Sequence, residues 1–133
     1  MEQQKRKLTR GQLERLLSQR LQSLYRDQLG HQPSKVTCQL FDEKLAVVLE
    51  GAITAPEQLL ASNGQVALAE QVRSDLEKAI EPQLKALIET VLGVPVLDLL
   101  INAALITGRS GMIVILGGTP EVSNPETISK VKR

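Results

Sequence analysis

Aromatic side chains are almost absent from this chain of 133 residues. Tyr25 and Phe41 are the only two, and there is no tryptophan. A hydrophobic core must therefore be built from Leu, Ile, Val and Ala. Exposed rings on which bases could stack are missing too, which argues against the common modules that bind single-stranded nucleic acid.

Cysteine and histidine are equally scarce, with one residue of each, Cys38 and His31. A single cysteine excludes an internal disulfide and a cysteine metal cluster, and a reducing compartment fits best. No second histidine exists to complete a metal site. A Cys–His dyad would need an exposed thiol, but the strand pattern predicts that Cys38 points inward, where it behaves as a small apolar group. We therefore expect no catalytic residues, no cofactor, no metal site and no enzymatic activity.

Long apolar runs are also missing. No segment approaches the ~20 uninterrupted apolar residues that span a bilayer, and the N-terminus, MEQQKRKLTR, lacks the apolar run of a signal peptide. We expect a cytoplasmic protein without a membrane span.

Charge is balanced overall, with a formal net charge of +1, but it is unevenly spread. Residues 1–33 carry seven basic and three acidic side chains, whereas residues 34–93 carry five and nine. This asymmetry is compatible with self-association or with a basic arm that meets an acidic partner, and also with two solvated surfaces of opposite sign.

The first half of the chain predicts a helix, a hairpin and a short helix. Thr9 and Gln12 have the spacing of a capping box, and Gly30 ends the helix that begins there. Strands are predicted at 34–40, by alternation, and at 45–49, by a more continuous apolar run. Residues 54–57, Thr-Ala-Pro-Glu, then predict a helix over about 56–62.

A long amphipathic helix is predicted between Gly64 and Gly93. Its apolar stripe is formed by residues at steps of three and four: Val66, Ala69, Val72, Leu76, Ile80, Leu84, Leu87, Ile88 and Val91. The opposite face is charged and comprises Glu70, Arg73, Asp75, Glu77, Lys78, Glu81, Lys85 and Glu89. Because the stripe continues across Pro82, we expect one bent helix. Glu77 and Glu81 are interpreted as part of a salt-bridged solvent face and not as a catalytic pair.

A second hairpin follows, with a strand over about 96–106, a loop over 107–111 and a returning strand from Met112 to Leu116. One face of the first strand is wholly apolar and is expected to meet the helices: Leu97, Leu99, Ile101, Ala103 and Leu105. The other face is mixed: Val96, Asp98, Leu100, Asn102, Ala104 and Ile106. A half-polar face of this kind is either half-exposed or covered by a partner.

Together these elements predict an α+β domain with the order α-ββ-αα-ββ, in which two hairpins form an antiparallel four-stranded sheet with the helices packed on one face. We expect residues 1–8 to be a flexible basic N-terminus, residues 9–117 to form the single domain, and residues 118–133 to form a disordered tail.

The sequence favours a non-enzymatic interaction module that docks a partner protein through a sheet face or edge, with self-association as a homodimer. Its candidate partner-binding residues are Asp98, Leu100, Asn102, Ala104, Arg109, Arg15 and Arg20. The alternative is a KH-like nucleic-acid-binding domain, since the element order overlaps and the first helix is rich in arginine. Near-neutral charge and the sequence LLASNGQV, where a GxxG loop would stand, argue against it.

Residues 8–117 resemble the MpsC-like family, named after the C component of the Na+-translocating membrane-potential-generating system. The match lies in the early helix, the hairpin with AVVLEGAITAPEQLL, the helix VRSDLEKAIEPQLKALIETVLGVPV and the final hairpin with Thr-Gly-Arg at 107–109. Residues 54–57 stand for the TPAE-type element of the family. The resemblance implies an accessory to a membrane system linked to sodium, bicarbonate or membrane potential, with a membrane-transport component or a cytosolic assembly as the partner. It implies no catalytic residues.

Overall fold

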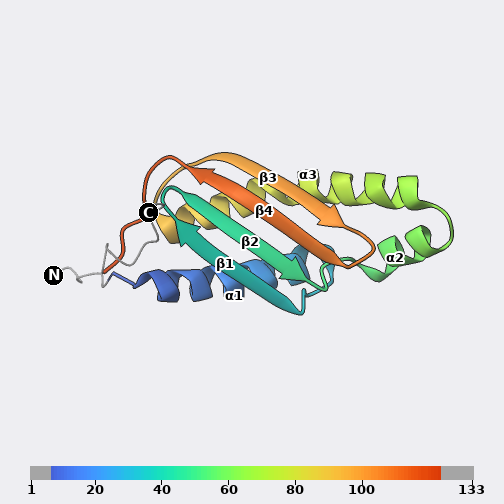
Figure 1. Ribbon diagram of the computed structural model, residues 1–133, viewed down its shortest axis with the longest axis horizontal. Helices are drawn as coiled ribbons and strands as arrows, with labels where there is room; N and C mark the ends of the chain where they lie inside the picture. Colours follow the sequence, from blue (N-terminus) through green and yellow to red (C-terminus); the bar gives the residue numbers. More distant parts are fainter. Residues whose placement is uncertain (1–6, 124–133) are drawn as a thin grey trace, which may run out of the picture.

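The computed structural model describes residues 7–123 and has the predicted α+β fold. Along the chain its elements are α1 (Arg10–Leu29), β1 (Lys35–Phe41), β2 (Lys44–Glu50), α2 (Ala55–Ser62), α3 (Val66–Leu92), β3 (Val96–Ala104) and β4 (Arg109–Leu116). Figure 1 shows these helices on one face of the sheet, while the other face carries none of them. The expected order α-ββ-αα-ββ and the one-sided helix layer are confirmed.

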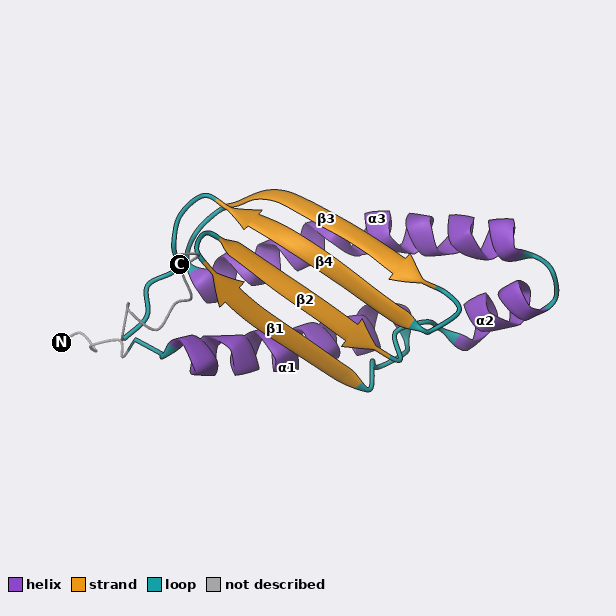
Figure 2. Cartoon of the chain, viewed as in Figure 1, coloured by secondary structure: helices purple, strands orange, loops and turns teal. Residues whose placement is uncertain are grey.

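All neighbouring strands in the sheet are antiparallel, and their spatial order is β1-β2-β4-β3. Each hairpin thus keeps its own two strands together, and the hairpins meet where β2 pairs with β4 (Figure 2). The β1–β2 turn consists of Asp42 and Glu43, with Asp42 at a φ of 53°. Asp tolerates this left-handed conformation better than most residues do.

Helix α1 begins and ends where the sequence predicts. Thr9 Oγ1 accepts a hydrogen bond from Gln12 N at 3.1 Å, and Gln12 Oε1 accepts one from Thr9 N at 2.9 Å, which completes the capping box. The helix ends at Gly30, whose φ is 69°. Its apolar stripe contributes buried residues to the hydrophobic core, among them Leu17 and Leu21.

Helix α3 runs unbroken past Pro82, so the prediction of one continuous helix is confirmed. The prediction that Arg73 and Glu77 lie on its solvent face is wrong, because both are buried. The apolar stripe also departs from expectation, since Val66 is 47% exposed. In Figure 1 the first turns of α3 extend past the end of the sheet and lie beside α2, so these turns have no sheet to cover them.

The expected assignment of side chains to faces is wrong at the start of β3. Val96 is buried, whereas Leu97 is 62% exposed. The cause is a register shift between Val96 and Asp98, where one extra residue enters the strand. A bulge of this kind reverses the alternation at that point. Beyond it the predicted faces hold, with Leu99 and Ile101 packed toward the core.

Part of the expected tail lies against the domain. Val122 is buried in the hydrophobic core, and Ser123 N donates a hydrogen bond to Leu8 O at 3.0 Å. After β4 ends, the chain therefore returns to the start of α1. Burial of Val122 in the core favours this path. The remainder of both expected flexible segments, residues 1–6 and 124–133, lies outside the described residues.

Candidate functional site

The candidate site is the sheet face turned away from the helices, which we call the outer face. Its side chains on β2, β4 and β3 form four rows across the strands. In order, the rows are Glu50, Arg109 and Ala104; Val48, Gly111 and Asn102; Ala46, Ile113 and Leu100; and Lys44, Ile115 and Asp98. The second and third rows are apolar apart from Asn102, and the first and fourth rows carry the charges.

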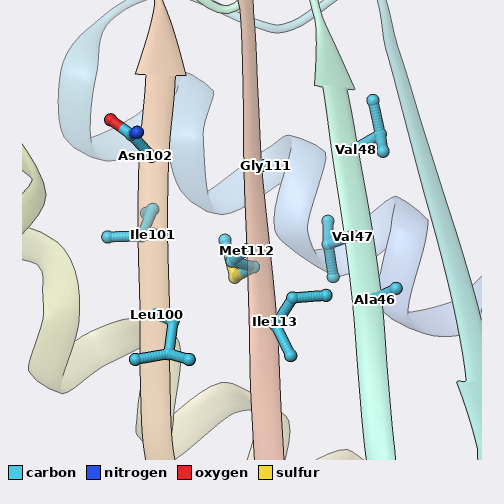
Figure 3. A pocket seen from close by; sticks show the side chains of 9 residues that line it. All are labelled: Ala46, Val47, Val48, Leu100, Ile101, Asn102, Gly111, Met112 and Ile113. Carbon is cyan, nitrogen blue, oxygen red and sulfur yellow. The ribbon is translucent and has the colours of Figure 1, made fainter.

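The two middle rows surround a shallow hollow of about 430 Å³. Among the described residues that line it, Asn102 alone has a polar side chain. Figure 3 shows bare backbone at Gly111 between Asn102 and Val48. A Cβ atom at Gly111 would lie 3.3 Å from Val47 O, which is a tight contact. The floor of the hollow is therefore formed by backbone, without a side chain at this position.

Large aliphatic side chains stand around this floor and are open to solvent. Leu100 is 59% exposed, Val48 is 43% exposed and Ile113 is 38% exposed. The first row is held in place by an ion pair, in which Arg109 Nε lies 2.8 Å from Glu50 Oε1. The outer face therefore combines an apolar centre with charged ends, which is the composition of a protein-binding surface.

One position on the β1 edge of the sheet is closed by α1. Leu40 N donates a hydrogen bond of 2.8 Å to Glu14 Oε2. An edge amide paired with a carboxylate from its own chain is not available to an incoming strand.

The β3 edge is partly closed by side chains in the same way. Val96 N donates to Glu89 Oε2 at 2.8 Å, and Ala103 N donates to Asn102 Oδ1 at 2.9 Å. In an antiparallel edge strand, alternate residues point their amides outward, so Leu99 and Ile101 are left between these two closed positions. This short stretch offers little room for strand addition.

A buried ion pair joins α2 to α3. Arg73 Nε lies 2.7 Å from Glu57 Oε2, and Arg73 Nη2 lies 2.8 Å from Glu57 Oε1 and 2.9 Å from Ala52 O. Burial by itself raises the pKa of Glu57, but the hydrogen bonds from Arg73 and Thr54 outweigh it, and the pKa lies below its ordinary value. Glu57 is the one residue of α2 that is buried, so this pair attaches the helix to the domain.

Burial and the charge of Arg73 act in opposite directions on the pKa of two other buried groups, the Tyr25 hydroxyl and the Glu77 carboxyl. Burial raises the pKa of Tyr25 to about 12, opposed by the nearby Arg73 guanidinium. Burial also raises the pKa of Glu77 above its ordinary value, again opposed by Arg73. Both groups are therefore uncharged over a wider pH range than in water, which suits a structural role.

The nucleophile and the base considered from the sequence, Cys38 and His31, each have a structural environment. Cys38 is buried on β1, as predicted, and burial raises the pKa of its thiol to about 11. His31 Nε2 lies 2.8 Å from Gly51 O, a backbone carbonyl. The thiol is therefore held in its unreactive form, and the imidazole is bonded to the backbone.

The structure brings together most of the residues that the sequence singled out. Asp98, Leu100, Asn102 and Ala104 are exposed on the outer face, as expected, and Arg109 stands at its end.

Arg15 and Arg20 do not belong to this surface. They are exposed on α1, in the layer on the opposite side of the sheet (Figure 1). Arg20 is five positions after Arg15, which places the two about 140° apart around the helix. They therefore form neither part of the outer face nor one continuous basic strip.

Sequence reasoning missed Val48, Gly111 and Ile113 as parts of the site. The apolar runs of β2 and β4 gave no clear alternation, so no outward face was assigned to either strand. Strand order supplies the missing information, because β2 and β4 are the two inner strands and bring their outward side chains together.

The described residues include no group of three or more His, Cys, Asp or Glu placed to hold a metal ion. None of the helices that residues 7–123 form is long and apolar enough to cross a membrane. The hollow offers an apolar surface and one amide, groups that make contacts and do not exchange protons near neutral pH.

Comparison with known proteins identifies a family. Residues 9–118 match the family model described as Na+-translocating membrane potential-generating system (MpsC). No curated protein and no solved structure matches the chain.

Proposed function

The chain belongs to the MpsC family, and from this premise we propose that it is a non-enzymatic interaction module, an accessory or assembly factor of a membrane-potential system. It docks a protein partner on the outer face of its sheet. The family description supplies the context of the system.

The observation that supports this function is the apolar centre of the outer face. Leu100, Val48 and Ile113 expose aliphatic surface around the hollow at Gly111. Burying such surface is worth roughly 25 cal/mol per Å², so a protein partner that covers it gains affinity. Within residues 7–123, no helix or loop of the chain lies over this face (Figure 1).

The edges of the sheet support docking on the face in preference to strand addition. Glu14 closes β1 at Leu40, and Glu89 and Asn102 close two positions of β3. An added strand would have to displace these bonds, whereas a partner on the outer face displaces only water.

A matched pair of charge substitutions tests the proposal. Leu100→Glu places a carboxylate in the apolar centre, and Leu59→Glu places one on α2, where the leucine is almost equally exposed, 63% against 59%. Both variants should fold with unchanged circular dichroism. In capture of partners from solubilised cells of the source organism, with retained proteins identified, Leu100→Glu should lose a defined partner that the native protein and Leu59→Glu retain.

Equal retention by all three proteins would refute docking on the outer face. Retention of nucleic acid by the native protein, with loss on Arg15→Glu and Arg20→Glu, would support the KH-like alternative instead. Retention by the native protein of its own copies alone, lost in Leu100→Glu, would identify the partner as a second copy.

A further inference from the structure

We propose that the partner on the outer face is a second copy of this chain, and that the two copies are related by a two-fold axis that crosses the strands between the second and third rows. This inference rests on the proposed function, since it names the occupant of the same surface. Rotation about such an axis keeps each strand opposite its own counterpart and reverses the order of the rows. The second row of one copy then faces the third row of the other, and the first row faces the fourth.

Side-chain size is complementary in this arrangement. Val48 lies opposite Ala46 of the second copy, and Ile113 lies opposite Gly111 of the second copy. Both of these large side chains thus meet a small residue, as interdigitated packing between two sheets requires. The hollow at Gly111 receives Ile113, and because a two-fold contact is reciprocal, this happens twice.

Charge is complementary as well. Glu50 in the first row lies opposite Lys44 in the fourth row of the second copy. Arg109 lies opposite Ile115 of the second copy and diagonally next to its Asp98. Every charge in these rows therefore gains an opposite charge across the contact. The Glu50–Arg109 ion pair within each copy becomes part of a larger network.

A competing two-fold axis, parallel to the strands between β2 and β4, satisfies size and charge as well. It places Val48 opposite Gly111 and Ile113 opposite Ala46, which is again large against small. It also places Glu50 opposite Arg109, and it places Lys44 opposite Ile115 and diagonally next to Asp98, just as the proposed axis places Arg109. The outer face is therefore self-complementary about either axis, and the two arrangements differ in whether Glu50 faces Lys44 or Arg109 of the second copy.

Two charge reversals separate these arrangements. Lys44→Glu and Glu50→Lys each create like charges across the proposed contact, at both symmetric positions. Each variant alone should raise the Kd of the dimer about tenfold, because it replaces both symmetric Glu50–Lys44 pairs by pairs of like charge. An equimolar mixture of the two should recover the native Kd. In the mixed dimer the two substituted side chains face each other with opposite charges, and the native Glu50 of one copy still faces the native Lys44 of the other.

Sedimentation equilibrium of the full chain measures these constants, and circular dichroism confirms that each variant is folded. Glu70→Lys and Lys78→Glu, both exposed on α3, are the matched controls and should leave the Kd unchanged alone and mixed. Failure of the mixture to recover affinity would overturn the proposed axis. A native protein that stays monomeric up to millimolar concentration would overturn self-association.

The two proposals fail separately. If the native chain is monomeric and Leu100→Glu still abolishes capture of another protein, the outer face is a docking surface for a different partner and only this inference falls. If the chain is monomeric and Leu100→Glu changes nothing, both fall.

Discussion

Replacement of Glu57 by glutamine should cost far more stability than replacement of Glu50, although both residues bond an arginine at nearly the same distance. In the Arg73–Glu57 pair the side chains are 4% and 0% exposed, and the shorter contact is 2.7 Å. In the Arg109–Glu50 pair they are 56% and 37% exposed, and the contact is 2.8 Å. Burial, and not bond length, distinguishes the two perturbations.

The magnitude follows from what Arg73 loses. Two of its three hydrogen bonds go to Glu57 and one goes to Ala52 O. Removing the carboxylate charge leaves a buried guanidinium uncompensated, which typically costs about 3–5 kcal/mol. The exposed pair is solvated after the change, so Glu50→Gln should cost less than about 1 kcal/mol.

Urea unfolding at neutral pH, followed by circular dichroism, measures both free energies of unfolding. The double variant Glu57→Leu with Arg73→Met should recover most of the loss, because it removes both charges from the interior. Equal losses for Glu57→Gln and Glu50→Gln would refute this reasoning. The stabilisation from Glu57 should also have a defined pH range: its pKa is lowered, so it is present above the unfolded-state pKa of about 4.3 and is lost as pH falls through the folded-state value.

Three other predictions concern single side chains. Glu77 has a raised pKa, so native stability should decrease as pH rises from about 4.3 through the folded-state value, and Glu77→Gln should flatten this part of a plot of urea midpoint against pH. Glu14→Ala should cost about 1–3 kcal/mol and accelerate hydrogen exchange at the Leu40 amide, which loses its acceptor; unchanged exchange would contradict this. Cys38, buried and with a pKa of about 11, should react with a disulfide reagent at pH 8 much more slowly in the native protein than in urea.

Local signals in the sequence predicted the elements and their ends. Thr9, Gln12 and Gly30 delimit α1, and Gly93 ends α3, because caps and left-handed C-termini depend on a few neighbouring residues. The two hairpins follow from short turns between apolar stretches. These features need no knowledge of what the elements pack against.

The errors lie where packing between distant elements decides. Arg73 was expected in solvent, yet α2 brings Glu57 to it from 16 residues away and makes its burial favourable. Leu97 was expected in the core, but one bulge residue reversed the alternation. The outer face itself depends on which strands are neighbours, and a chain with two hairpins allows several strand orders that share the same periodicity.

The junction between the two inner strands also constrains the order in which the chain folds. Each hairpin closes over a short turn, but Leu49 meets Ser110 only after α2, α3 and β3 have been placed between them. Closing the long segment between Leu49 and Ser110 lowers the entropy of the chain before the contacts between β2 and β4 have formed. This pairing is therefore expected to limit the folding rate. A formed α3 shortens the segment to be closed, because a helix rises only about 1.5 Å per residue. Helix-stabilising changes on the exposed side of α3 should therefore accelerate refolding more than they slow unfolding.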